Sequence, residues 1–376
     1  MSTGLAGIPE RIPPGSGEDS VSEAQNRRAA GVSAMSALRP AWERLGADHP
    51  MRSYAWAHAC AEAFPNNGLH IVSAGESAPR AIAAFVCGPD SRTLVPLGAQ
   101  LYEPAEFACA DASAAEALGE TIARLETTVL IRDIYADSPV VKGLQRAGGR
   151  RVVTQPVAGH PWLKLDDSWL EAEQHLNAGR RSDLRRAQRN AAKLGAVTCE
   201  ITCPTAAELT PLLDEAFLVE AAGWKGNQGS ALATDPHVGG FYRRYAEAAC
   251  LLGTLRIGIL RIGGRAAAMQ FAVEQGGCFW LFKMGFDESF ARFSPGTLLM
   301  VESLRRARLR GCQRYELMGQ SEAWNQIWAP RLHEAVSVQL HAPTVRSWVK
   351  IIEQRAKGAL KRQLLLHREK ATEKSK

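Results

Sequence analysis

Residues 290–311, FARFSPGTLLMVESLRRARLRG, combine a helix start with a place that suits an anion. Ser294 is a preferred N-cap residue, because its hydroxyl can accept a hydrogen bond from a first-turn N–H, and Pro295 is favoured at the first helical position. Gly296 is not needed for capping and costs roughly 1 kcal/mol relative to Ala inside a helix. Unpaired N–H groups and the helix dipole favour an anionic group beside such a bare backbone. A plain, well-capped helix start is the competing interpretation.

A lysine in the preceding predicted strand is a second candidate for chemistry. Lys283 lies in the strand-like segment 278–285, where a lysine is uncommon. It either anchors a substrate or extends its amine to the edge of the sheet. Strict alternation along the strand predicts that Lys283 shares a face with Leu281, opposite Trp280.

Two carboxylates follow the predicted helix. Glu316 ends the next predicted strand, and Glu322 lies in the loop beyond it. A carboxylate at such a strand end can act as a general base if burial raises its pKa toward neutrality. A salt bridge between Glu316 and Arg314, or between Glu316 and a basic helix, is the alternative interpretation.

The elements that must position these residues form two mixed regions, 31–165 and 166–343. In the second region, three strand-like runs are joined at Gly263-Gly264 and Gly276-Gly277, and paired glycines of this kind are typical of hairpins. The third strand, the helix after Pro295 and the final strand should form a βαβ unit with two parallel strands. The predicted fold class is α/β, of the α+β type, with mixed but mostly antiparallel sheets and flanking helices.

Length and composition are those of a globular protein with two domains. The chain has 376 residues, of which 46% are hydrophobic and 22% are charged. No apolar stretch approaches the roughly 20 residues of a membrane span. The eight cysteines contain no CxxC pair and no zinc-type cluster, so we expect no metal and a reducing cytoplasm. Residues 1–30 predict a disordered leader and carry no secretory signal.

The net charge of +6 is concentrated in two segments. Residues 180–193 contain six Lys or Arg and one Asp, and residues 346–376 contain ten Lys or Arg and three Asp or Glu. Arg181 and Arg185 belong to one face of the first segment, which is either merely solvated or holds an anionic partner such as cofactor phosphates, lipid headgroups or RNA. The tail 344–376 is either an amphipathic helix on an anionic membrane or a basic helix packed on the body. No motif predicts sequence-specific DNA binding.

Four stretches within residues 165–340 carry a family resemblance: RRSDLRRAQRNAAKLGAV, EAAGWKGNQGSAL, FKMGFDESFARFSPGTLL and YELMGQSEAWNQIW. Together they resemble the acetyltransferase domain of the CelD/BcsL family, which occurs in bacterial cellulose and exopolysaccharide operons. Residues 31–165, with AWERL, YAWAHACAEAF and VLIRDI, resemble that family's degenerate first GNAT-like domain. FemA/FemB-type aminoacyltransferases share the tandem layout. The chain departs from the family at Glu316, where Asp is usual, and at Asn325, where Lys is common.

The resemblance implies two tandem GNAT-like domains, with an active site in the second that transfers an acyl group from acyl-CoA to an amine. It implies that a backbone N–H near Met284 polarises the thioester carbonyl. The implied catalytic residues are Glu316, Lys283, Gln270 and Glu322. The implied cofactor-binding residues are Ser294, Pro295, Gly296, Thr297, Leu298 and Met284. The implied acceptor-binding residues are Trp224, Lys225, Arg181, Arg185 and Trp324.

The expected acceptor is an amino sugar or a lipid-linked amine in bacterial envelope or exopolysaccharide metabolism. Three alternatives stay open. One is a long-chain N-acyltransferase of the ceramide-synthase type, and another is a FemA/FemB-like transferase that uses aminoacyl-tRNA and faces tRNA with its basic helix. The third is a non-catalytic GNAT-like scaffold. We expect a cytoplasmic protein, with peripheral association at the inner membrane as an open possibility.

Overall fold

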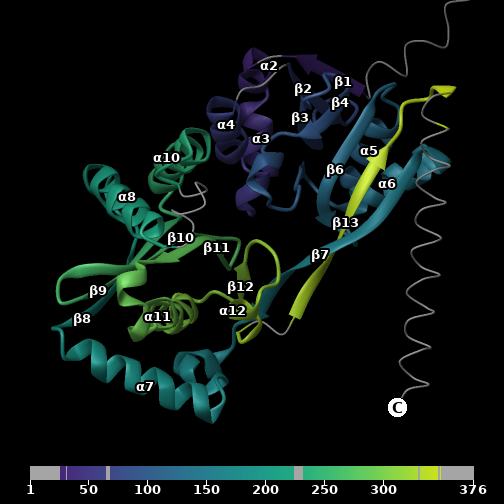
Figure 1. Cartoon of the computed structure of the whole chain (residues 1–376). Coiled ribbons are helices and arrows are strands. Elements are labelled where there is room, and N and C mark those ends of the chain that lie inside the picture. The colour runs from purple at the N-terminus through teal and green to yellow at the C-terminus, as the bar shows by residue number, and fades with distance from the viewer. Residues whose placement is uncertain are drawn as a thin grey trace, which may run out of the picture.

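The computed structural model describes residues 26–30, 32–64, 68–223, 232–328, 331–345 and 348. The described strands join into one 13-stranded sheet, in the order β1-β2-β3-β4-β6-β13-β7-β12-β11-β10-β9-β8, with β5 paired to β3. Figure 1 shows the sheet running through two domains, with helices packed against each half. The fold is therefore the expected α/β arrangement, with a mixed sheet and flanking helices in each of two domains.

The first domain contains the first six strands. They are β1 (Asn26–Ala30), β2 (Leu69–Ala74), β3 (Ala81–Cys87), β4 (Thr93–Pro96), β5 (Ala108–Cys109) and β6 (Thr128–Tyr135). Its helices are α2 (Val32–Ala37), α3 (Arg39–Leu45), α4 (Tyr54–Ala63), α5 (Ala112–Ala123) and α6 (Pro139–Gly148), with 3₁₀ turns at Pro50–Arg52, Ala99–Leu101 and Gly149–Arg151. The predicted disordered leader is wrong for residues 26–30, because they pair with β2 as an antiparallel edge strand. Residues 1–25 lie outside the described residues.

The second domain contains most of the remaining elements. Its strands are β8 (Val197–Thr202), β9 (Leu255–Ile262), β10 (Arg265–Gln275), β11 (Cys278–Phe286) and β12 (Arg314–Leu317). Its helices are α7 (Ala178–Ala192), α8 (Ala206–Ala221), α10 (Pro236–Leu251), α11 (Pro295–Leu309) and α12 (Ala323–Gln326), with 3₁₀ segments at Asp167–His175 and Glu288–Phe293.

The predicted meander and βαβ unit are confirmed. Strand β10 pairs antiparallel with both β9 and β11, and β11 pairs parallel with β12. The paired glycines at 263–264 and 276–277 all have positive φ angles, which is the backbone that a two-residue hairpin turn requires at both central positions. Glycine adopts this backbone without steric cost, so these turns follow directly from the sequence.

Two strands connect the domains. Strand β7 (Val152–Lys164) pairs with β13 along most of its length and with β12 at its end. Strand β13 (Arg331–Leu340) lies between β6 and β7, and its Val338 and Leu340 are buried in the first-domain core. The sequence division at residue 165 placed β13 with the second domain, whereas its pairing and packing place it in the first.

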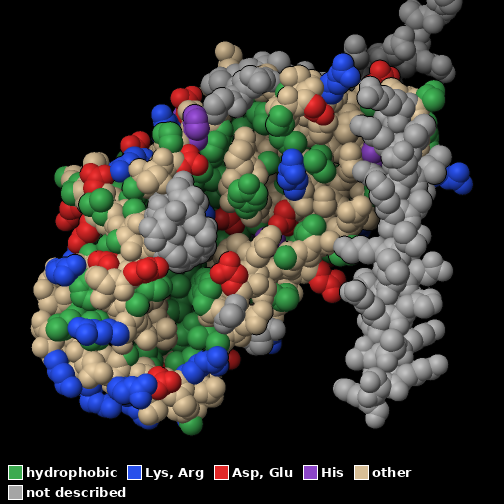
Figure 2. Space-filling view, viewed as in Figure 1, with side chains coloured by type: hydrophobic (Ala, Val, Ile, Leu, Met, Phe, Trp, Pro, Cys, Tyr) green, Lys and Arg blue, Asp and Glu red, His purple; other side chains and the backbone are tan. Residues whose placement is uncertain are grey.

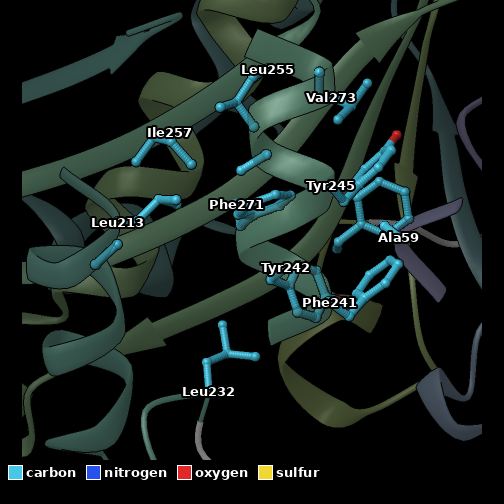
Figure 3. Packing of buried hydrophobic residues seen from close by; sticks show 14 of the residues in the cluster. Ala59, Leu213, Leu232, Phe241, Tyr242, Tyr245, Leu255, Ile257, Phe271 and Val273 are labelled. Carbon is cyan, nitrogen blue, oxygen red and sulfur yellow. The ribbon is translucent and has the colours of Figure 1, made fainter. Parts of the chain in front are cut away.

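A shared hydrophobic core holds the two domains together. Trp56 of α4 packs against Phe241 and Tyr245 of α10, with ring centroids 4.8 and 5.0 Å apart, and against Phe282 of β11 at 5.1 Å. Figure 3 shows Ala59 of α4 beside the rings of α10, over the strand that carries Phe271. Buried aromatic pairs of this kind contribute stability beyond their buried area, so this core fixes the first domain against the second-domain sheet.

Candidate active site

A cavity opens where β11 and β12 diverge. The two strands pair only from Cys278 to Leu281 of β11, and the Met318 N–H donates to the Leu281 carbonyl oxygen at 3.1 Å. Beyond Leu281, β10 is the one described strand that pairs with β11, so the other edge of residues 282–286 is open. A cavity of ≈ 590 Å³ lies there. This volume falls in the range of small-molecule sites in proteins.

The start of α11 forms part of the cavity wall, but Ser294 does not cap the helix as expected. Ser294 has φ +48° and ψ +49°, and its side chain makes no capping hydrogen bond. In this left-handed conformation the hydroxyl does not reach the first-turn N–H groups. Ser294, Pro295, Gly296 and Thr297 all line the cavity. The first turn of α11 therefore faces the cavity without a side-chain cap.

Leu298 does not belong with these residues. Its N–H donates to the Ser294 carbonyl oxygen at 3.1 Å, and Leu298 is not part of the cavity lining. The N–H groups of the first helical positions have no partner inside the helix, and Pro295 has no N–H. The donors that this turn can offer to an anion are therefore those of Gly296 and Thr297.

Gly296 is not required by packing within the protein. A Cβ atom built at Gly296 would lie 3.7 Å from Phe286 Cδ1 and 4.0 Å from Met284 Cε, which are ordinary contacts. At Gly285 the situation is different, because a Cβ atom there would lie 2.9 Å from Glu220 Cγ and 3.0 Å from Glu220 Cα. Gly285 thus allows α8 to approach β11. Gly296 is not needed for packing of this kind, and its backbone lines the cavity.

The predicted orientation of Lys283 is wrong, because β11 contains a β-bulge. Lys283 pairs with Phe271 and Leu281 pairs with Ala272, which leaves Phe282 as the extra residue. The bulge moves Lys283 onto the face of β11 that carries Trp280. Lys283 lines the cavity, and its Nζ lies 5.4 Å from the centre of the Tyr242 ring. Bulges commonly redirect a side chain beside an active site.

Two of the four catalytic candidates lie away from the cavity. Glu316 is buried and bonds to His333 Nε2 at 3.1 Å, with Arg314 at 3.9 Å, and it does not line the cavity. This arrangement corresponds to the salt-bridge alternative. Gln270 is also buried outside the lining, with its Nε2 3.5 Å from the sulfur of Met284.

Glu322 and Trp324 line the cavity together. The Trp324 Nε1–H donates to Glu322 Oε2 at 2.9 Å, and the Asn325 side chain accepts a hydrogen bond from the Glu322 N–H at 2.9 Å. The bond between the Glu322 N–H and the Asn325 side chain is one half of a capping box that starts α12, and its other half runs from the Asn325 N–H to the Glu322 side chain. Glu322 therefore holds a tryptophan at the cavity wall.

The remaining acceptor candidates do not line the cavity. Arg181 of α7 donates through Nη1 to the Leu176 carbonyl oxygen at 2.5 Å, and Arg185 is exposed. Neither is part of the lining. Figure 2 shows Lys and Arg side chains gathered along the lower edge of the molecule, over α7. Trp224 and Lys225 lie outside the described residues.

Glu103 of the first domain lines the cavity, and it was not among the predicted site residues. Glu103 lies in the loop between the 3₁₀ turn 99–101 and β5, and it lines the cavity together with Lys283. Its Oε2 is enclosed and has no hydrogen-bond partner among the described residues. Burial raises the pKa of Glu103 to about 7, against the opposing charge of Lys283. Nothing in the local sequence, GAQLYEPAEF, distinguishes this carboxylate from a loop residue on the surface.

A hydrogen-bonded group of both domains surrounds Glu103. The Gly319 N–H lowers the pKa of the Glu103 carboxyl in opposition to burial, and His160 Nδ1 lies 2.9 Å from the Gly319 carbonyl oxygen. His160 Nε2 lies 3.0 Å from both carboxylate oxygens of Asp133. Burial disfavours the charged form of His160, but the hydrogen bond and charge of Asp133 outweigh it and raise the pKa of His160. The loop after β12 is thereby tied to the first domain.

The described residues contain neither a metal-type cluster nor a helix that could span a membrane. Among these residues, no group of three or more His, Cys, Asp or Glu side chains is arranged to hold a metal ion. None of the described helices has the length and apolar character needed to span a membrane.

Comparison with known proteins agrees with this geometry. Residues 178–326 match the family model described as Acetyltransferase (GNAT) domain. This segment contains β8–β12 and α11, and therefore most of the cavity wall apart from the first-domain loop. No curated protein sequence matches the chain.

Several solved structures share the fold of almost the whole chain. The C-terminal domain of a protein assigned as a lysylphosphatidylglycerol synthetase from Agrobacterium fabrum is 12% identical, with a TM-score of 0.54 over 85% of this chain and 95% of that chain. L-PGS from Bacillus licheniformis is 10% identical, with a TM-score of 0.52 over 86% and 96%. FemX is 12% identical, with a TM-score of 0.51 over 76% and 90%. At these identities the likeness shows the fold alone.

Proposed function

We propose that this protein is a GNAT-type acyltransferase that moves an acyl group from acyl-CoA to a primary amine. The observation that carries the proposal is the cavity at the divergence of β11 and β12, with the uncapped first turn of α11 in its wall. The match of residues 178–326 to a GNAT acetyltransferase family supports it. Membership of the CelD/BcsL family stays a prediction.

The donor would occupy the wall formed by β11 and α11. The N–H groups of Gly296 and Thr297 suit the phosphates of coenzyme A, because the helix dipole favours an anion there. The open edge of residues 282–286 can form hydrogen bonds with the extended arm of the donor, as an added strand does. An N–H of this edge near Met284 would polarise the thioester carbonyl. Trp324, held by Glu322, would form part of the wall for the acyl group.

The test of the donor site compares two glycines at the same helix position. Gly296 is the second residue of α11 and Gly179 is the second residue of α7, and a Cβ atom at Gly179 would have its nearest contact 3.5 Å away, at Asn177 Oδ1. Gly296→Val should weaken acetyl-CoA binding at least tenfold in calorimetry, because the side chain enters the space for phosphate. Gly179→Val should leave binding unchanged. Unchanged binding by a folded Gly296→Val protein would remove the basis of the proposal.

A second candidate is transfer from aminoacyl-tRNA, favoured by the exposed basic face of α7 in Figure 2. It predicts tRNA binding that ribonuclease abolishes and that Arg185→Glu with Arg189→Glu weakens. Lys142→Glu, the reversal of a single positive charge on the exposed side of α6, serves as the control for Arg185→Glu made alone. Binding of acyl-CoA without tRNA binding would exclude this candidate. Acyl-CoA binding without turnover of any amine would instead favour the scaffold alternative.

Acceptor identity and location in the cell stay proposals. An amino sugar, a lipid-linked amine and the long-chain base of a ceramide-synthase reaction all carry the required amine. The predicted membrane contact involves residues 344–376. Of these, the structure describes only 344, 345 and 348. Flotation with anionic liposomes should separate the full chain from a 1–345 truncation if this contact exists.

A further inference from the structure

A second cavity lies in the first domain and meets the candidate active site. Its volume is ≈ 190 Å³. Tyr102, Glu103 and Gln320 line both cavities, so the two spaces adjoin at these residues. Tyr102 has φ +60° and its side chain is 80% exposed. Left-handed backbone is unfavourable for a tyrosine, and this strain lies at the junction of the two cavities, as it often does at binding sites.

The walls of this first-domain cavity are mostly apolar. Trp42, Met51, Trp56, Leu97 and Phe107 belong to its lining. A cavity of this volume has room for about six non-hydrogen atoms, if each takes up about as much space as a water molecule in the liquid. Apolar walls with a few polar groups are typical of sites for small organic molecules. The space suits a short alkyl chain or a phenyl ring.

Three carboxylates line the same cavity, and two of them are already paired. Glu106 accepts a hydrogen bond from Arg52 Nε at 2.8 Å, and Asp133 is bonded to His160 at 3.0 Å. Glu103 Oε2 has no hydrogen-bond partner among the described residues. An enclosed carboxylate oxygen without a partner is costly. Glu103 is therefore the carboxylate that a ligand at the junction would satisfy.

We infer that the first-domain cavity binds the apolar body of the acceptor, a primary alkylamine or arylalkylamine, and that Glu103 at the junction receives the proton from its nitrogen. The inference deepens the proposed function and rests on it for the reaction, although not for the binding of the amine. It places the acceptor in the first domain and the acyl donor in the second. The active site is then incomplete without the first domain.

The transfer balances with these groups alone. The lone pair of the neutral amine forms the N–C bond to the thioester carbonyl carbon, and the C–S bond breaks with its electron pair on sulfur. The nitrogen loses one proton to the carboxylate of Glu103, and that proton then goes to the thiolate. The products are an amide and the free thiol of coenzyme A, with Glu103 ionised again.

The walls favour this class of acceptor over an amino sugar. A sugar ring carries several hydroxyl groups, and each needs a hydrogen-bond partner when it leaves water. The pairs Arg52–Glu106 and His160–Asp133 already use three of the polar side chains in the lining. An alkyl or phenyl group has no such requirement and gains from burial against Trp42 and Trp56.

Calorimetry of amine binding without any acyl donor tests the inference directly, at pH 8. Hexylamine should bind the wild-type protein and glucosamine should not. Ala99→Leu, which adds three carbon atoms to a residue of the cavity lining, should weaken hexylamine binding at least tenfold. Ala57→Leu, from α4 in the same lining, provides a second filling variant. Glu103→Gln should weaken binding about tenfold by removing the charge that faces the ammonium. Glu62→Gln, an exposed carboxylate of α4, should have no effect.

The same proteins separate failure of the inference from failure of the proposed function. If wild-type protein does not bind hexylamine, or if both filling variants bind it normally, the inference is overturned whatever happens with acetyl-CoA. If hexylamine binds as expected but no acyl-CoA does, the acceptor site stands and the proposed donor is wrong. Thermal unfolding of each variant shows whether the fold is retained.

Turnover gives the role of Glu103 a separate readout. With hexylamine and acetyl-CoA, release of the thiol should fall at least 100-fold in kcat for Glu103→Gln, as is typical for loss of a general base. Acetyl-CoA affinity should change less than twofold. The rising limb of kcat/KM near pH 7 in the wild type should disappear in the variant. An unchanged pH profile together with a normal kcat would show that Glu103 is not the base.

Discussion

The molecule contains the same β-helix-β unit twice, and only the first copy has another strand between its two strands. In the first domain α6 connects β6 to β7, and β13 lies between these two strands and pairs with both. In the second domain α11 connects β11 to β12, which pair directly and then separate at the cavity. Figure 1 shows β13 as the yellow strand beside β6 and β7.

The difference shows how one architecture serves two purposes. Where the chain fills the gap with its own strand, the backbone groups of β6 and β7 are paired and the unit is structural. Where no described strand fills the gap, the edge of β11 beyond Leu281 and the first turn of α11 can bind a ligand. In the proposed reaction the first domain contributes through the loop that carries Glu103.

The largest expected effect concerns the filled unit. Val338 of β13 is 1% exposed, and Val338→Asp would bury a charge in the first-domain core. We expect a loss of about 4 kcal/mol of unfolding free energy, because an unpaired charge in a core is strongly unfavourable. Denaturant unfolding monitored by circular dichroism measures it. Val345→Asp, at a residue that is 84% exposed, should change stability little. Equal stability of the two variants would show that the gap between β6 and β7 does not depend on β13.

The next effect concerns the open unit and depends on pH. Burial raises the pKa of Glu103 from 4.5 to about 7, so the folded protein favours the protonated form. The stability contributed by this group is present below pH 4.5 and is lost as pH rises to 7, by at most about 3 kcal/mol. Glu103→Gln should therefore gain stability relative to the wild type at pH 8 but not at pH 4.5.

Denaturant titrations at these two pH values measure the difference. Glu62→Gln should parallel the wild type at both. A Glu103→Gln protein that is less stable than the wild type at pH 8 would mean that the ionised carboxylate makes favourable contacts that outweigh its burial.

The smallest effect concerns the two Ser-Pro helix starts. Ser138 before α6 has φ −56°, whereas Ser294 before α11 has φ +48°. Because a left-handed backbone is unfavourable for serine and not for glycine, Ser294→Gly should gain about 1 kcal/mol. Ser138→Gly should gain nothing and lose up to about 1 kcal/mol, because glycine increases the entropy of the unfolded chain. Urea unfolding compares the two. A gain at Ser138 equal to that at Ser294 would contradict the conformational explanation.

Much of the second-domain fold could be predicted because its signals are local. The glycine pairs at 263–264 and 276–277 require positive φ angles, and Pro295 favours the first helical position, so hairpins and helix follow from neighbouring residues alone. The bulge at Phe282 could not be predicted in this way. One extra residue in β11 reverses the alternation, and Lys283 is therefore on the opposite face from the one expected.

Only the part of the candidate site at the start of α11 could be predicted, because it depends on neighbouring residues. Ser294 to Thr297 line the cavity because they start the helix that borders it, and their predicted role in cofactor binding stays a prediction. Glu316 was a reasonable base candidate from its place at a strand end. Its hydrogen-bond partner His333 belongs to β13, and no local sequence pattern predicted that strand. The pairing of Glu316 could therefore not be predicted.

The sequence by itself determined the meander, the parallel βαβ unit and the bare glycine at the second position of α11. These features depend on backbone preferences within a few residues. Only the tertiary structure decided that β13 fills one gap while the other stays open, and that Glu103 and Lys283 line one cavity from two domains. Both features depend on which distant segments pack together. The pKa of a side chain and the groups that it contacts are set by its neighbours in space and not by its neighbours in sequence.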